Sequence, residues 1–304
     1  MPRYWKYLLI FLFASVLLVF LATFSLTDTR LHLVFCDVGQ GDAILAYKGS
    51  TQILIDGGPD KSVLACLSSH MPFWDRKIEL IVLTNADKDH YAGLIDVIRR
   101  YQIIKYSSSG VDKEGAGMDA LKAELKNRSV PTVDLNFGDE VKLGELKLYT
   151  LWPTKAWLAR AKNPEPGMRN LVLAATDSPN EFSVVVRLSY GEFDVLLTGD
   201  IEPPASDQAA GIVNSESDSE VTWEVLKVPH HGSKNGLTQK LLEAVSPALA
   251  VISVGKNNRY GHPSKEALGF LDSLGVRILR TDLDREVEVV TDGKTWSTKV
   301  QLSE

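Results

Sequence analysis

The sequence predicts an α/β fold, in which short buried strands alternate with amphipathic helices. The first observation is a set of short apolar runs, each followed at once by polar residues; Ile78–Leu83 and Phe193–Leu197 are two of them. Runs of this kind are typical of buried strands. The second observation is that Leu94, Ile98 and Tyr101 fall at i, i+4 and i+7, which gives one apolar helix face. At 304 residues and 44% hydrophobic composition, the chain can bury a sizeable core.

The predicted elements follow one another along most of the chain. We expect strands over Leu31–Asp37 and Ala43–Ile55 with a turn at Lys48–Ser50, helices over Lys61–Ser69, Ala92–Tyr101 and Met118–Asn127, a hairpin of Val184–Leu188 and Phe193–Leu197, a helix over Lys265–Leu274, and closing strands over Val276–Thr298. The segment Ile201–Glu220 is rich in Ser, Asp, Ala and Pro, which predicts an irregular surface loop.

Residues 1–30 are expected to form a membrane anchor. Tyr7–Phe24 is a charge-free stretch of 18 residues, near the lower limit for a helix that crosses a bilayer. Arg3 and Lys6 precede it, and the positive-inside rule keeps such residues in the cytoplasm. We therefore expect a single-pass protein whose domain, residues 31–304, lies outside the cytoplasm, in the periplasm or the extracellular space. A signal peptide is the alternative, although its cleavage site would be poor.

The two cysteines, Cys36 and Cys66, are expected to be free and buried, because a free Cys behaves as a small hydrophobic residue. A disulfide is the alternative, which an exported domain would permit. Neither cysteine lies near a histidine cluster, and we exclude both as metal ligands.

The net charge of −6 gives no overall attraction to nucleic acid. The local balance differs between Lys227 and Lys265, where there are six Lys or Arg residues and one acid. A basic segment on an acidic protein suits a phosphate-bearing substrate, and a solvated basic face is the alternative.

A dense group of potential metal ligands follows the strand predicted at Ile78–Leu83. The segment Asn85–His90 contains two carboxylates, a carboxamide and an imidazole. Carboxylate oxygen and imidazole nitrogen bind divalent metals, but Asn and Asp also suit turns for conformational reasons. This segment alone leaves a metal site and a solvated turn equally open.

Four other predicted strands also end in polar clusters, and these favour the metal site. The clusters contain Asp56, Asp200, His230 with His231, and His262. Four of the six histidines therefore follow strand ends, although turns have no special need of His. Ligand clefts in layered α/β folds form beyond the carboxyl ends of strands, so we expect these clusters to converge on one site. Because that site needs both halves of the chain, it predicts one domain.

In their order, these motifs resemble the metallo-β-lactamase superfamily and, more narrowly, the hydrolase domain of ComEC-type competence proteins. The motifs are Asp37–Ala43, Leu54–Gly58, the Asp87/Asp89/His90 loop, Leu197–Asp200, Lys227–Ser233 and Tyr260–Pro263. The resemblance covers about Leu31–Gly293. It implies an αββα sandwich of two mixed sheets flanked by helices, preceded here by one N-terminal hydrophobic helix. It also implies a divalent metal cofactor, Zn or Mn, as one or two ions.

The resemblance further implies roles for individual residues. The implied metal ligands are Asn85, Asp87, Asp89, His90, Asp200 and His231. Asp200 would bridge the two metal positions and orient the attacking water. His230 would contact the substrate, and His262 would donate to a leaving group or an oxyanion at the mouth of the cleft. Asp42 and Asp56 would accept hydrogen bonds from the ligands or the water.

The first metal position departs from the superfamily pattern. Asn85 and Asp87 stand where the superfamily has two histidines. The site is therefore richer in oxygen donors than a His-rich site. This composition favours Mn or Mg more than a His-rich site does, or it leaves one metal position half-occupied.

These features predict a metal-dependent hydrolase, since a divalent ion lowers the pKa of a bound water. The favoured substrate is a phosphodiester, with DNA and nuclease activity as the narrower prediction. Lys234, Lys256 and Arg259 would hold the flanking phosphates. Two alternatives stay open: a hydrolase of another envelope phosphoester or amide, and a binding module whose metal site has decayed through Asn85. The resemblance would imply a role near DNA uptake.

Overall fold

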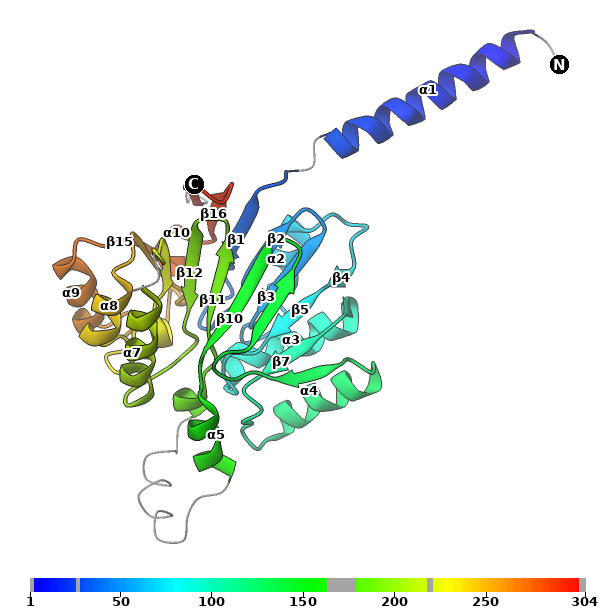
Figure 1. The fold of residues 1–304 in the computed structure, drawn as a ribbon. Coiled ribbons are helices and arrows are strands. Elements are labelled where there is room, and N and C mark those ends of the chain that lie inside the picture. The colour runs from blue at the N-terminus through cyan, green and yellow to red at the C-terminus, as the bar shows by residue number, and fades with distance from the viewer. Residues whose placement is uncertain (1–2, 26–27, 163–178, 218–220, 301–304) are drawn as a thin grey trace.

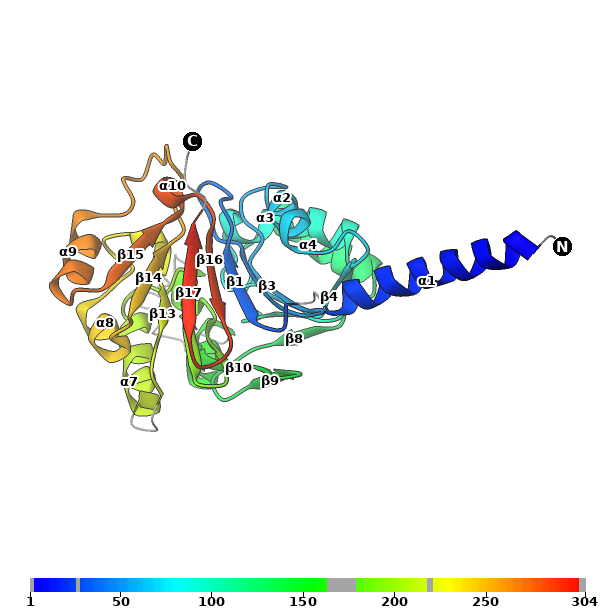
Figure 2. The same cartoon turned by 90° about the horizontal axis from the view of Figure 1, so that it is seen from above.

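The computed structural model describes residues 3–25, 28–162, 179–217 and 221–300. Two mixed β-sheets pack face to face, and helices cover both outer faces (Figure 1). Figure 2 shows the four layers from above, with α7 (Ala205–Ser217), α8 (Gln239–Val245) and α9 (Lys265–Ser273) on one side. The helices α2 (Val63–His70), α3 (Lys88–Arg100) and α4 (Ala116–Asn127) lie on the other side. The predicted α/β sandwich is confirmed.

The first sheet combines strands from both ends of the domain. In spatial order it contains β17 (Trp296–Val300), β16 (Val287–Thr291), β1 (Leu31–Phe35), β2 (Ile44–Lys48), β3 (Thr51–Ile55), β5 (Leu80–Val82), β7 (Tyr106–Ser108) and β8 (Thr132–Asp134). Pairing is antiparallel from β17 to β3 and parallel from β3 to β8. The parallel strands β3 and β5 therefore end at the same edge of the sheet.

The second sheet has the same mixed character. In spatial order it contains β15 (Arg277–Arg280), β14 (Leu249–Ile252), β13 (Val225–Lys227), β12 (Phe193–Leu197), β11 (Val185–Tyr190), β10 (Leu146–Trp152) and β9 (Glu140–Leu143). The strands β12 to β15 are parallel, and β9 to β12 are antiparallel. Short elements complete the described domain: β4 (Lys77–Ile78) paired with β6 (Gln102–Ile103), α5 (Lys155–Lys162), α10 (Thr281–Asp284), and the 3₁₀ turns Pro179–Phe182 and Pro229–Gly232.

Three apolar layers hold the sandwich together, and the strands supply side chains to two of them at once. In β1, Leu31, Leu33 and Phe35 lie in the layer between the sheets. Val34, on the opposite face of the same strand, lies in the layer under α2, α3 and α4. This follows from the two-residue period of a strand. Burial on both faces explains why the central strands are mostly apolar in sequence.

The N-terminal helix α1 (Arg3–Ser25) extends away from the sandwich (Figure 1). Within the residues that the structure describes, no helix combines the length and the apolar character that a bilayer crossing requires. This finding contradicts the predicted membrane anchor, the single-pass topology and the location of the domain outside the cytoplasm.

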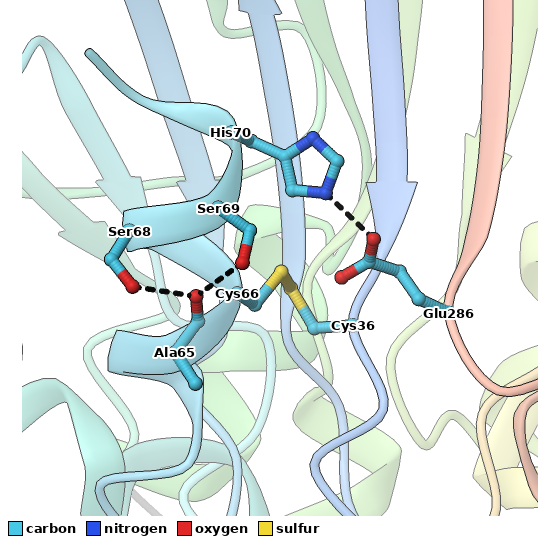
Figure 3. The surroundings of a disulfide bond; sticks show 7 residues. All are labelled: Cys36, Ala65, Cys66, Ser68, Ser69, His70 and Glu286. Carbon is cyan, nitrogen blue, oxygen red and sulfur yellow. Dashed lines mark hydrogen bonds and ion pairs between the residues drawn. A yellow bond between two sulfur atoms is a disulfide. The ribbon is translucent and has the colours of Figure 1, made fainter. Parts of the chain in front are cut away.

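The prediction of free cysteines is also wrong. Cys36, at the end of β1, and Cys66, in α2, form a disulfide with a Cα–Cα distance of 5.9 Å (Figure 3). Both residues are buried, as predicted. The sequence could only offer the disulfide as the alternative, because the packing of α2 against the end of β1 joins segments that are 30 residues apart.

Candidate functional site

The polar clusters that follow the strand ends converge on one cleft. In the first sheet, β3 leads into Asp56, and β5 leads through Asn85 into α3. In the second sheet, β12 leads into Asp200 and β13 into His230 and His231. A backbone hydrogen bond joins the two sheets here, since the amide of Val184, just before β11, donates to the carbonyl of Thr84, just after β5. The expectation that strand ends would bring these residues together agrees with this placement.

Four side chains form a compact group of potential metal ligands: Asp89, His90, Asp200 and His231, whose ligand atoms all lie within 4.8 Å of one another. Asp200 Oδ2 is 3.1 Å from His90 Nε2 and 3.4 Å from His231 Nε2. His231 Nε2 is also 3.4 Å from Asp89 Oδ2. Ligands that surround a zinc ion tetrahedrally at 2.0–2.2 Å stand about 3.4 Å apart. The observed spacing therefore fits a single divalent ion.

Unpaired polar atoms in this group support the same fit. His90, His231 and Asp200 are buried, and His90 Nε2, His231 Nε2 and Asp200 Oδ1 lack a hydrogen-bond partner within the described residues. Buried polar atoms without partners are costly. A cation coordinated by these atoms would remove that cost, and the two-imidazole, two-carboxylate donor set suits Zn²⁺ and Mn²⁺.

Neighbouring groups fix the orientation of the two imidazoles. His90 Nδ1 donates to Asp56 Oδ2 at 2.8 Å, and Asp56 in turn accepts from the amide and hydroxyl of Thr84 at 2.7 and 2.5 Å. His231 Nδ1 donates to the carbonyl of Ser253 at 2.9 Å. Because each Nδ1 carries the proton, each Nε2 presents its lone pair to the ligand group.

The electrostatics of the group also favour a cation. Burial alone would lower the pKa of His231, but the Asp200 and Asp42 carboxylates outweigh it and raise that pKa to about 10. Burial of Asp200 opposes its ionisation, yet His231 and His90 hold its pKa well below the usual value. The carboxylates thus attract positive charge strongly enough to protonate buried imidazoles. A divalent ion would take the place of those protons.

A buried ion pair lies behind the ligands. Lys227 Nζ is 2.5 Å from Asp42 Oδ2, and both side chains are almost fully buried. Burial raises the pKa of Asp42, but the Lys227 ammonium outweighs this and lowers it to about 2. Asp42 Oδ1 lies 3.5 Å from His231 Nδ1. The structure therefore brings Asp42 and Asp56 behind the two histidine ligands, and it removes Lys227 from the basic surface inferred from the sequence.

Asn85 and Asp87 are placed differently from the four grouped ligands. The Asn85 amide donates to Asn180 at 2.7 Å and to Ser183 at 3.1 Å, and its carbonyl oxygen accepts from the backbone amide of Asp87 at 2.9 Å. Asp87 forms an ion pair with Lys113 at 2.6 Å. Both side chains thus have protein partners, and neither belongs to the compact ligand group.

The cleft above the ligands is a cavity of about 350 Å³. It is lined by Gln40, Asp87, Lys88, Asp89, Asp200, His230, His231, Tyr260 and His262. Glu202 Oε1 accepts from His230 Nδ1 at 2.7 Å, and His230 Nε2 lies 3.8 Å from Asp200 Oδ2. His262 is half-buried at the rim, with Nδ1 unpaired within the described residues. Burial and the nearby His230 charge lower the pKa of His262.

The three predicted substrate-binding residues are not equivalent. Arg259 lines an adjoining cavity of about 740 Å³ that shares Gln40, Lys88, Asp89 and Tyr260 with the cleft. Lys234 and Lys256 are exposed and line neither cavity.

Four residues at the site were missed by sequence reasoning: Glu202, Lys227, Lys88 and Tyr260. Lys227 had a signal, because it is a charged residue inside an apolar strand. Glu202 had none, since it lies in a segment that was predicted to be a surface loop. Lys88 and Tyr260 are adjacent to predicted site residues and could have been included for that reason.

Comparison with known proteins adds relatives in sequence and in structure. ComE operon protein 3 of Bacillus subtilis (strain 168) is 27% identical over 83% of this chain and 32% of its own length. YcaI of Escherichia coli (strain K12), an uncharacterised protein, is 34% identical over 87% of the chain and 30% of its own length. The chain thus spans about a third of the length of these relatives.

Solved structures share the fold at low sequence identity. The metallo-β-lactamase fold protein YhfI of Bacillus subtilis has a TM-score of 0.53 at 10% identity, covering 88% of this chain and all of its own. The metallo-hydrolase Igni18 of Ignicoccus hospitalis has a TM-score of 0.50 at 14% identity, covering 88% and 98%. The sequence profile of the metallo-β-lactamase superfamily matches residues 36–256. The sequence motifs, the fold and this match agree: the chain belongs to the metallo-β-lactamase superfamily, and it resembles the ComEC-type competence proteins within it.

Proposed function

We propose that this chain hydrolyses phosphodiesters with one divalent ion, Zn or Mn, held by Asp89, His90, Asp200 and His231. The convergence of these four side chains, three of whose buried atoms have no hydrogen-bond partner among the described residues, is the observation that carries the proposal. When bound, a divalent ion makes hydroxide available near neutral pH. The superfamily fold supports the broader activity, a metal-dependent hydrolase.

Two histidines at the cleft perform the proton transfer in this proposal. Glu202 fixes the ring of His230 through Nδ1, so that Nε2 faces the cleft beside Asp200. His230 holds a proton for the leaving-group oxygen at Nε2. His262 lies 5.6 Å from His230, between ring centroids, and donates to the developing oxyanion from the rim.

Positive charge around the cleft favours a phosphodiester as the substrate. Lys88 lines both cavities, and Arg259 lines the larger one. Each can bind a phosphate oxygen, Arg with two donors. Lys234 and Lys256 extend the positive surface beyond the cavities. Since the competence proteins are relatives, DNA is the phosphodiester we propose first, with a role near DNA uptake.

A metal analysis coupled to a phosphodiesterase assay tests the proposal. We expect about one equivalent of metal per chain and hydrolysis of bis-p-nitrophenyl phosphate with Zn or Mn. Asp89→Asn and His231→Ala should abolish both, whereas Asp96→Asn, at a partly exposed aspartate of the same helix α3, should change neither. A folded protein that neither binds metal nor hydrolyses the reporter with Mn, Zn or Mg contradicts the proposal.

One observation favours a second candidate, a metal-binding module without catalysis. The Asn85 amide and the Asp87 carboxylate have protein partners, so only half of a two-metal site would remain. This candidate predicts one equivalent of metal but no hydrolysis. The proposed single-ion site also predicts that Asn85→Ala retains the full metal content, because Asn85 supports the loop through Asn180 and Ser183.

A further inference from the structure

A second group of potential metal ligands lies around the disulfide, apart from the cleft. Figure 3 shows the ring of His70 pointing to Glu286, with the Cys36–Cys66 disulfide beside them. The two sulfur atoms and a carboxylate oxygen of Glu286 lie within 4.8 Å of one another. His70 Nε2 is 2.6 Å from Glu286 Oε1. Three segments meet here: the end of β1, the helix α2, and the residue before β16.

The local structure directs these side chains toward one point. Cys66 and His70 are four residues apart in α2, a spacing that places both on one face of the helix. Both cysteines are buried, and the side chains of His70 and Glu286 are 14% exposed. In the described part of the chain, Glu286 forms its ion pair with His70 and with no lysine or arginine. Its charge is therefore available to a metal cation.

We propose that, once the disulfide is reduced, Cys36, Cys66 and Glu286 bind a thiophilic divalent cation such as Zn²⁺, with His70 as fourth ligand or as the partner that orients Glu286. Two thiolates with nitrogen and oxygen donors form a donor set typical of zinc. Thiolates are poor ligands for Mn²⁺ and Mg²⁺, which prefer oxygen. The donor set of this site therefore differs from the two-imidazole, two-carboxylate set of the cleft.

The conversion requires a dithiol reductant. Two electrons and two protons pass from the reductant to the protein: the Cys36–Cys66 bond breaks, two thiols form, and the two sulfurs of the reductant join as its own disulfide. Zinc then displaces the two thiol protons. The loop Asp37–Asp42, which begins directly after Cys36 and carries Asp42 to the cleft, is thus tethered to α2 by the disulfide or by the metal.

A cobalt titration of the full chain tests the proposal, before and after dithiothreitol treatment and anaerobic removal of the reductant. Thiolate ligation of Co²⁺ gives an intense near-ultraviolet charge-transfer band. Because the chain contains only two cysteines, such a band must arise from this pair. We expect the reduced protein to bind one equivalent of cobalt more than the oxidised protein, with the band growing over that extra equivalent. Zinc should remove the band, and the oxidised protein should show none.

Three variants test whether Glu286 and His70 contribute to metal binding or whether the two cysteines bind the metal without them. Cys66→Ser should remove the band, and Glu286→Gln and His70→Ala should each weaken cobalt binding at least about tenfold. The matched control is Glu266→Gln, an exposed glutamate of α9, which should bind as the parent does. The oxidised form of Glu286→Gln keeps its disulfide, and its circular dichroism reports whether the variant folds.

Two results would overturn the proposal: reduced protein that shows no thiolate band, or a band whose cobalt affinity is unchanged in both Glu286→Gln and His70→Ala. Neither result depends on hydrolysis, so the proposed function is tested separately.

Discussion

Lys227 and Asp42 place opposite charges in the protein interior, directly behind the candidate metal ligands. Such a pair contributes little net stability, because each charge loses its hydration on burial. Its value here is positional: Asp42 lies 3.5 Å from His231 and also has His90 within 3.9 Å. The ammonium keeps Asp42 ionised, and the ionised carboxylate attracts both imidazoles electrostatically.

Lys227 and Asp42 should contribute to stability as a coupled pair. We expect Lys227→Met to lower the free energy of unfolding by about 3–5 kcal/mol, since Asp42 is left as an uncompensated buried charge. The double variant Lys227→Met/Asp42→Asn should lose less than the two single losses added together. Urea denaturation measures both, with the exposed Lys234→Met as control. Additive losses would show that the pair is not coupled.

Glu288 gives a pH-dependent contribution to stability. Its hydrogen bond from His32 and the nearby Lys299 lower its pKa from 4.5 to about 2. A carboxylate with a lowered pKa stabilises the fold above its unfolded pKa, and this contribution is lost as pH falls from about 4.5 to 2. Glu288→Gln should therefore cost about 1–2 kcal/mol near neutral pH. In denaturation at several pH values, the difference from the parent should shrink below pH 4.5; a constant difference contradicts this account.

At the residue scale, four of the six predicted ligands lie together, whereas Asn85 and Asp87 bond to neighbours that the sequence did not indicate. Asp89, His90, Asp200 and His231 follow strand ends, and strand ends at one edge must lie together. Asn85 bonds to Asn180, and Asp87 bonds to Lys113. No local sequence pattern shows that these residues come together in the fold.

At the element scale, the clearest error concerns α7. Pro203, Pro204 and several Ser residues predicted a loop, yet a helix begins at Ala205. Proline just ahead of a helix is compatible with its first turn, because no intrahelical N–H bond is lost there. The helix buries Ala205, Ala209 and Val213 against the second sheet. Small apolar residues gave too weak a pattern for the buried face to be recognised.

The same substitution in two helices should have opposite effects. A Cβ added at Gly211, in α7, meets nothing within 4 Å, so Gly211→Ala should stabilise by about 0.5–1 kcal/mol through helix propensity. At Gly93, in α3, the added Cβ would overlap the backbone carbonyls of Gly57 and Asp60. Gly93→Ala should therefore destabilise the protein by more than 1 kcal/mol. Thermal unfolding measures the midpoint temperature of both variants. Equal shifts of that midpoint would contradict the predicted difference between the two positions.

At the scale of the whole molecule, two sheets and one disulfide join segments that are distant in sequence. The layered α/β class followed from the apolar runs, because strands buried on both faces must lie between other layers. The Cys36–Cys66 bond did not follow, since it depends on how α2 packs at the end of β1. The membrane anchor was inferred from a single apolar stretch, which proved too weak a basis.

The disulfide should account for a large part of the net stability. It closes a separation of 30 residues, and loss of such a cross-link costs about 3–4 kcal/mol by restoring freedom to the unfolded chain. Cys66→Ser should lose this amount in guanidinium denaturation with a chelator present. With dithiothreitol and the chelator, the parent should unfold at the same midpoint as the variant. A difference that persists under reduction would assign the loss to packing.

The pairing of β1 with β16 also matters for synthesis on the ribosome. His32 of β1 bonds to Glu288 of β16, 256 residues later. At 5–20 residues per second, one edge of β1 waits on the order of 10–50 s for its partner. An apolar strand with an unpaired edge is prone to associate with other chains during that interval. This topology thus makes the nascent chain dependent on protection of its first strand until nearly all of the domain has been translated.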